Sequence, residues 1–220
     1  MPSAPFVTVS RTETRLGSDA AIEAARAELA ERHHLVVRGL LEPELRDWLV
    51  QRVAAATFDP FVHTTGAVDL GMRPDPAIDG IRFLLSDPVV LHAVERVAGC
   101  GKLSGFYGRV YRMTEGAAHF DEWHDDLNGD RRVAVSLNLG QGRYEGGHLL
   151  LRDYATKALL ADVHNVGLGD VLLFRLGDDL EHNITRVTGP VPKTAFAGWF
   201  CSKTCGPGDL ARDSSLSGKP

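Results

Sequence analysis

The sequence predicts an α+β protein with a mainly β core, a jelly roll flanked by N-terminal helices. In the first hundred residues apolar positions recur at helical spacing, whereas after Gly101 short apolar runs alternate with turn-forming residues. Such evenly spaced short runs are typical of antiparallel sandwiches and barrels. We therefore expect a single domain over 1–220, with a helical layer over about 1–100, a jelly-roll core over about 101–203 and a mobile tail over 206–220.

The first predicted helix covers 19–32, where apolar residues follow one another at helical intervals. Ser18 stands directly before it, and a serine there can cap a helix by accepting a hydrogen bond from an N–H of the first turn. An apolar run then predicts a buried strand over 34–41. A second helix is expected over 42–57, with Pro43 in the first turn, where the missing N–H of proline removes no helical hydrogen bond.

The stretch between the second and third helices is rich in residues that break regular structure. Prolines and glycines are frequent over 58–80, which predicts a loop. A third helix is expected to open at Ser86-Asp87-Pro88, with the serine as cap and the proline just inside, and to end near Gly99.

The composition argues against several classes of partner. With a net charge of -5, a pI near 6.0 and no basic run, neither nucleic acid nor an anionic membrane is expected to bind. No apolar stretch approaches the ~18 residues of a membrane span, and the N-terminus lacks the pattern of a signal peptide.

The cysteines, Cys100, Cys201 and Cys205, are too few for a disulfide framework, and the last two are interpreted as structural thiols. This usage indicates a reducing compartment, so a cytoplasmic location is expected.

Three residues in the C-terminal half can hold a metal ion. His124 and Asp126 form a His-x-Asp pair, and His182 follows 56 positions later. Two imidazoles and one carboxylate on one face of a metal make the triad of non-haem Fe(II) oxygenases, which leaves other coordination positions open. On an extended strand, residues two apart point to the same side, so one strand can supply the first two ligands. Lys193, 11 positions after His182, adds a cation that can bind a carboxylate nearby.

A second His-x-Asp pair, His119 and Asp121, competes for the same role. With nine histidines and 29 acidic residues in the chain, one such pair arises readily by chance. The order of features favours a metal site over structural histidines: a pair, an apolar strand, a predicted turn at Gly146-Gly147, another at Gly169-Asp170, a late histidine and a base. The choice of His124 and Asp126 over the other pair depends mainly on a family resemblance.

Four segments carry that resemblance: WHDDLNGDRRVAVSLNLG, YEGGHLLLRD, GLGDVLLFR and LEHNITRVTGPVPKTAFAGWF. Together they resemble the prolyl-4-hydroxylase-like branch of the Fe(II)/2-oxoglutarate-dependent dioxygenases, over about 105–200. The resemblance implies a double-stranded β-helix with iron in its mouth, bound by the ligands His124, Asp126 and His182, which are also the catalytic residues. It further implies that Lys193 pairs with the distal carboxylate of 2-oxoglutarate.

Two more positions are implied to bind the cosubstrate. Tyr111 is similar to a tyrosine that lines the 2-oxoglutarate pocket in some relatives. Ser136 stands where some prolyl hydroxylases have a second tyrosine, so a smaller hydroxyl or another group supplies that contact. Because lysine is a point charge and not a bidentate fork, Lys193 is expected to need such a helper.

The resemblance implies hydroxylation of an unactivated C–H bond, with release of succinate and CO2. The implied cofactors are Fe(II), 2-oxoglutarate and O2, with ascorbate as a candidate reductant, and the substrate is a small molecule, an amino acid or a peptide side chain. The carboxylate of Asp126 argues against a halogenase, which lacks that ligand. A non-catalytic jelly-roll binding module and a metal enzyme that does not use 2-oxoglutarate are the alternatives. The sequence does not determine the oligomeric state.

Overall fold

The computed structural model describes residues 5–62, 68–116, 122–127 and 130–203. The helices are α1 (Asp19–Arg32), α2 (Pro43–Ala54), α3 (Pro76–Leu85) and α4 (Pro88–Ala98). The strands are β1 (Val7–Val9), β2 (Thr14–Leu16), β3 (His34–Val37), β4 (Phe58–Val62), β5 (Val68–Met72), β6 (Gly105–Met113), β7 (Arg131–Asn138), β8 (Leu149–Asp153), β9 (Leu159–Val163), β10 (Val171–Arg175), β11 (Leu180–Ile184) and β12 (Lys193–Cys201).

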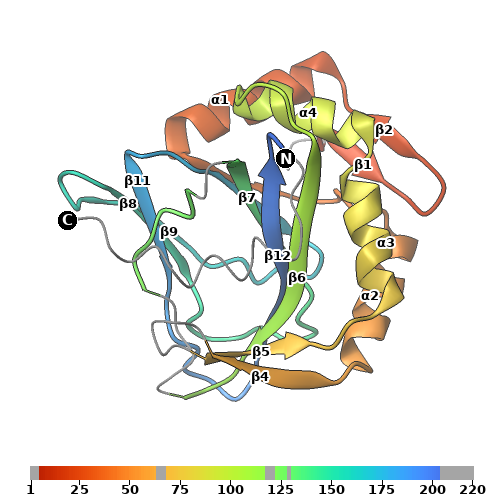
Figure 1. Cartoon of the computed structure of the whole chain (residues 1–220), viewed down its shortest axis with the longest axis vertical. Coiled ribbons are helices and arrows are strands. Elements are labelled where there is room, and N and C mark those ends of the chain that lie inside the picture. The colour runs from red at the N-terminus through yellow and green to blue at the C-terminus, as the bar shows by residue number, and fades with distance from the viewer. Residues whose placement is uncertain (1–4, 63–67, 117–121, 128–129, 204–220) are drawn as a thin grey trace.

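Two antiparallel sheets face each other and form the β core. The larger has seven strands in the order β3-β10-β7-β12-β6-β5-β4, and the smaller has three in the order β11-β8-β9. Figure 1 shows the helices gathered along one side of the larger sheet, with β8, β9 and β11 on its other side. The predicted mainly β core with N-terminal helices is confirmed.

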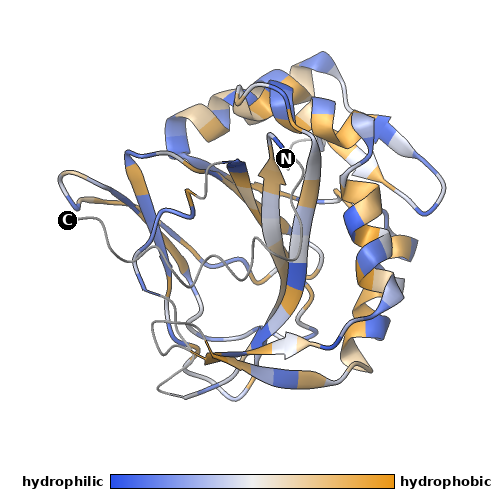
Figure 2. Ribbon diagram, viewed as in Figure 1, coloured by the Kyte–Doolittle hydropathy of each residue, from blue (hydrophilic) through white to orange (hydrophobic). Residues whose placement is uncertain are grey.

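Two of the hydrophobic clusters in the described residues fill the space between these layers. The larger core lies between the helices and the seven-stranded sheet, and it includes Leu49 of α2, Val94 of α4 and Phe196 of β12. A smaller core joins the two sheets, with Leu151 of β8 packed in the same cluster as Phe174 of β10. Hydrophobic and hydrophilic residues alternate along the helices in Figure 2, as expected for helices that bury one face. The seven-stranded sheet is therefore covered on both faces, and the metal-ligand candidates lie on the side of the smaller core.

The N-terminal cap of α1 agrees with the prediction from the sequence, and the N-terminal cap of α4 differs from it. Ser18 caps α1, because its Oγ accepts a hydrogen bond from the N–H of Ala21 at 3.2 Å. The cap of α4 is Asp87, and the prediction of Ser86 was wrong. Ser86 Oγ accepts a hydrogen bond from the N–H of Phe106 at 2.9 Å, which ties the α3–α4 corner to β6.

The loop predicted over 58–80 was wrong for most of its described length. This stretch contains β4, β5 and the first turns of α3, and β5 pairs with β6 at Leu70 and Gly71. Pro60 lies within β4, which is an edge strand of the seven-stranded sheet. An edge strand tolerates proline because the N–H that faces away from the sheet is not needed. The strand predicted over 34–41 is also shorter than expected, since β3 ends at Val37.

The strands β6 and β12 approach each other closely at the paired glycines Gly108 and Gly198. A Cβ atom on Gly198 would lie 2.1 Å from the carbonyl oxygen of Tyr107 and 2.5 Å from the Cα of Gly108. Gly198→Ala is therefore expected to lower the free energy of unfolding by about 1–3 kcal/mol, as in other overpacked sites. Gly80 in α3 is the control: an added Cβ meets nothing within 4 Å, so Gly80→Ala should stabilise by about 0.5–1 kcal/mol. Urea unfolding measures both, and equal effects would contradict the close-packing argument.

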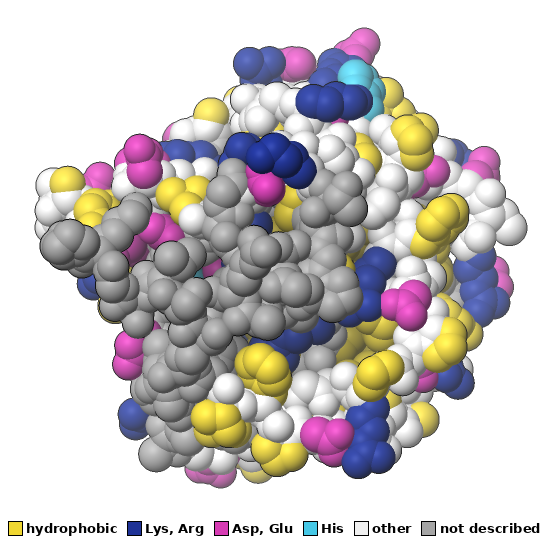
Figure 3. Space-filling view, in the orientation of Figure 1, with side chains coloured by type: hydrophobic (Ala, Val, Ile, Leu, Met, Phe, Trp, Pro, Cys, Tyr) yellow, Lys and Arg dark blue, Asp and Glu magenta, His cyan; other side chains and the backbone are white. Residues whose placement is uncertain are grey.

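The surface and the cysteines add three observations. No helix in the described ranges is long and apolar enough to cross a membrane. On the face drawn in Figure 3, the coloured Lys, Arg, Asp and Glu side chains are interspersed. Cys201 is disulfide-bonded, so its interpretation as a structural thiol was wrong, whereas Cys100 is a free thiol.

Candidate metal centre

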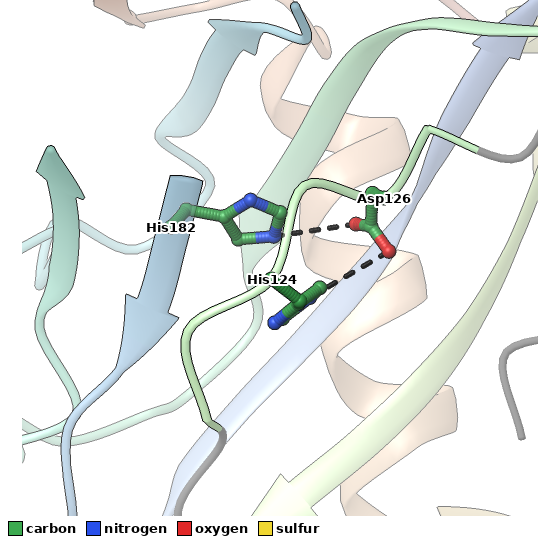
Figure 4. A group of neighbouring side chains, drawn as sticks. All are labelled: His124, Asp126 and His182. Carbon is green, nitrogen blue, oxygen red and sulfur yellow. Dashed lines mark ion pairs between the residues drawn. The ribbon is translucent and has the colours of Figure 1, made fainter. Parts of the chain in front are cut away.

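His124, Asp126 and His182 lie together between the two sheets. His182 comes from β11, and the other two come from the segment between β6 and β7 (Figure 4). His182 Nε2 lies 3.2 Å from Asp126 Oδ2, and His124 Nε2 lies 3.6 Å from Asp126 Oδ1. One ligand atom from each residue lies within 4.8 Å of the others, a grouping that can hold a metal ion.

The backbone that places these ligands is not the extended strand expected for His124 and Asp126. His124 forms an isolated bridge with His182, in which each N–H donates to the carbonyl of the other residue, at 3.0 and 2.8 Å. Two residues later the chain leaves the extended conformation, because Asp126 has a left-handed φ of 56°. Aspartate adopts this region more readily than most residues. The prediction that residue spacing on one strand aligns the ligands was therefore wrong.

A neighbouring carbonyl fixes the orientation of the His124 ring. Nδ1 of His124 lies 2.7 Å from the carbonyl oxygen of Glu122, so this nitrogen carries the proton and donates it. Nε2 is then the atom with a lone pair for a metal, which is the usual arrangement for ligating histidines. The His182 ring packs edge-on against Phe174, with ring centroids 4.9 Å apart.

Two side chains that the sequence reading did not identify hold the Asp126 carboxylate. The indole N–H of Trp199 donates to Oδ2 at 2.8 Å, and Arg131 Nη1 lies 3.2 Å from Oδ1. Burial raises the pKa of Asp126, but the nearby His124, His182 and Arg131 lower it by more, so the net pKa is well below its ordinary value. The carboxyl group is therefore ionised at neutral pH, as a metal ligand must be.

β12 runs beside the triad, since Trp199 on this strand contacts Asp126. Lys193, Ala195, Ala197 and Trp199 alternate along this strand, so their side chains share one face. Both alanines are small, and β12 lies between Tyr111 of β6 and Ser136 of β7, whose side chain lowers the pKa of the Tyr111 hydroxyl. Burial is the main reason that the pKa of Tyr111 is raised, so its hydroxyl stays protonated and can donate.

Lys193 lies at the other end of this face of β12 and is buried. Its Nζ donates to the carbonyl oxygen of Gly147 at 2.7 Å, in the predicted Gly-Gly turn. A Cβ on Gly147 would lie 2.9 Å from Cδ of Lys193, so only glycine leaves room for the lysine stem. Tyr144, whose ring centroid is 5.9 Å from Nζ, was also missed, although it stands in the YEGG motif that marks this turn.

The structure brings together the three metal-ligand candidates, and it places Tyr111 and Ser136 on the two strands that flank β12. The competing pair, His119 and Asp121, lies outside the described residues, as does the tail over 206–220.

Solved structures with the same fold include several oxygenases. A Pseudomonas putida prolyl-4-hydroxylase matches with a TM-score of 0.62 and 23% identity, over 83% of this chain and 100% of that chain. A Trichoplax adhaerens prolyl hydroxylase, solved with a peptide of hypoxia inducible factor, matches with a TM-score of 0.60 and 15% identity, over 95% and 99%. The non-haem α-ketoglutarate-dependent epimerase SnoN of nogalamycin biosynthesis matches with a TM-score of 0.62 and 15% identity, over 92% of each chain. These similarities confirm the double-stranded β-helix.

A family model supplies the sequence-level comparison. The model described as the 2OG-Fe(II) oxygenase superfamily matches residues 108–201, from β6 to the end of β12. A comparison with curated proteins found no match. The matched segment contains the three metal-ligand candidates together with Lys193. The segment from β6 to the end of β12 is therefore similar to the 2OG-Fe(II) oxygenase superfamily, a group of 2-oxoglutarate-dependent oxidoreductases.

Proposed function

We propose that this protein binds Fe(II) through His124, Asp126 and His182 and hydroxylates a C–H bond of its substrate. The supporting observation is that one nitrogen from each histidine and one aspartate oxygen lie within 4.8 Å of one another. Two imidazoles and a carboxylate suit Fe(II), so the residues present fit this ion. When bound together, Fe(II), 2-oxoglutarate and O2 supply the oxidising chemistry, which releases succinate and CO2.

The same proposal assigns the distal carboxylate of 2-oxoglutarate to Lys193, Tyr111 and Ser136. Lys193 supplies the positive charge, and its hydrogen bond to Gly147 fixes the position of the ammonium group. The Tyr111 hydroxyl, protonated because burial raises its pKa, supplies a neutral donor, and Ser136 supplies a second hydroxyl. Charge-assisted hydrogen bonds of this kind are the stronger ones in proteins, and burial strengthens them further.

The substrate class follows less directly. The similar structures include prolyl hydroxylases and an epimerase, so the fold alone does not select one substrate. We propose a small molecule, an amino acid or a peptide side chain as substrate, and ascorbate as a reductant that keeps iron active. The Asp126 carboxylate favours hydroxylation over halogenation. A single domain and a cytoplasmic location remain predictions from the sequence, and the disulfide at Cys201 does not favour the latter.

Anaerobic titration of the metal-free protein with Fe(II) and then 2-oxoglutarate tests the proposed function. A visible metal-to-ligand charge-transfer band is expected when the keto acid binds iron in the site. Binding of Fe(II) without the band would favour a metal enzyme that does not use 2-oxoglutarate. Absence of Fe(II) binding would leave the non-catalytic jelly-roll module as the remaining explanation.

A further inference from the structure

Arg131 is a buried cation in contact with the carboxylate of the candidate metal centre. Its side chain is 2% exposed, and Nη1 lies 3.2 Å from Oδ1 of Asp126. Its guanidinium carbon lies 3.6 Å from the ring centroid of Trp199. Burial of a charge is unfavourable unless partners compensate for the lost water, so this placement calls for a physical explanation.

Trp199 holds the second oxygen of the same carboxylate. Its indole N–H donates to Oδ2 of Asp126 at 2.8 Å, while its ring lies under Arg131. The two side chains come from neighbouring strands of the seven-stranded sheet, β7 and β12. They therefore fasten the loop that carries Asp126 to the rigid sheet and fix the rotation of its carboxylate. A neutral donor in place of Arg131 would serve that orientation equally well, so its charge has a separate consequence.

The charge matters because it lies next to a site for a cation. Histidines that bind a metal ion are neutral, so the three ligands together carry one negative charge, that of Asp126. The positive charge of Arg131 offsets it. A trivalent ion at this centre is repelled by Arg131 more strongly than a divalent ion is. For charges roughly 6 Å apart at an effective dielectric constant of about 20, each added unit of ion charge weakens binding on the order of 10- to 100-fold.

We propose that Arg131 and Trp199 are a positioning pair for Asp126, in which the Arg131 charge biases the centre toward Fe(II) over Fe(III). This inference rests on the proposed function, since it requires iron at the triad. It predicts that removing the charge favours the ferric ion selectively, whereas removing the indole N–H weakens binding of both ions alike.

The test is an anaerobic redox titration of the iron-loaded protein, with the ferric form followed by electron paramagnetic resonance. Arg131→Gln keeps an N–H donor and removes the charge. Its ratio of Fe(III) to Fe(II) affinity is expected to rise by about tenfold or more, which lowers the midpoint potential by ~59 mV per tenfold. Arg131→Lys keeps the charge and should stay within about threefold of the parent ratio. Trp199→Phe should reduce Fe(II) affinity but leave the midpoint within the same limits.

Arg152→Gln is the matched control. The Arg152 guanidinium lies 4.0 Å from the Trp123 ring centroid and bonds to Glu181, so it is also an arginine stacked on a tryptophan near the triad. It has a carboxylate partner other than Asp126, and its removal should shift the affinity ratio by less than about threefold.

Two results would overturn the inference. One is an iron-loaded, folded Arg131→Gln protein whose midpoint matches the parent. The other result applies if circular dichroism shows that Arg131→Gln does not fold. In that case a tenfold change in the ratio of Fe(III) to Fe(II) affinity in Arg131→Lys, which keeps the charge, would overturn the inference. Failure of the parent protein to bind Fe(II) at all would instead reject the proposed function.

Discussion

Asp126→Asn is expected to reduce Fe(II) affinity by more than about 100-fold, and to eliminate the charge-transfer band with 2-oxoglutarate. Loss of a residue that only supports a metal ligand typically costs 10- to 100-fold in affinity, so loss of a charged ligand should cost more. Asparagine is chosen over alanine because it preserves the shape of the side chain beside Trp199 and Arg131. An amide oxygen lacks the negative charge that binds the ion. Calorimetric titration with Fe(II) under argon measures the change.

The control for this prediction is the competing histidine. His119→Ala should bind Fe(II) as the parent does. His124→Ala should lose Fe(II) binding, as Asp126→Asn does. The opposite result, with loss in His119→Ala and retention in His124→Ala, would move the metal site to the other His-x-Asp pair. Far-ultraviolet circular dichroism of each variant separates loss of the site from loss of the fold.

Lys193→Met is expected to raise the dissociation constant of 2-oxoglutarate by roughly 10- to 100-fold and to leave Fe(II) binding unchanged. Hydrogen bonds to charged groups contribute about 1.5–3 kcal/mol, and each 1.4 kcal/mol is about tenfold in affinity. Methionine keeps the length of the stem that packs against Gly147, so the pocket should keep its shape. Binding is measured on the Fe(II)-loaded protein through the charge-transfer band.

A second ligand shows whether the effect acts on the distal carboxylate. In 2-oxopentanoate a methyl group replaces that carboxylate, so its affinity should be equal in the parent and in Lys193→Met. Equal losses for both keto acids would mean that Lys193 acts through pocket structure and does not pair with the carboxylate. Lys157→Met is the control, because Lys157 pairs with Glu181 on the smaller sheet and should leave both affinities unchanged.

Local patterns in the sequence were sufficient to predict elements whose hydrogen bonds join residues only a few positions apart. The bounds of α1 and its cap at Ser18 agree with the structure, because a helix and its cap depend on neighbours in sequence. Gly146 and Gly147, which the sequence marks as a turn, both have positive φ values, a conformation that favours glycine. By contrast, β4 and β5 were missed because their pairing with each other and with β6 is not encoded by local periodicity.

The sequence by itself determined the chemistry of the candidate centre: which residue types are present, in which order, and that the β core follows the helices. Only the tertiary structure decided how Asp126 reaches the histidines, since a left-handed loop and a two-bond bridge between His124 and His182 replace the expected strand. It also revealed the Arg131 and Trp199 contacts to the carboxylate. The Trp199 contact joins residues 73 positions apart, and the geometry of both contacts depends on the packing of β7 against β12, which no short segment contains.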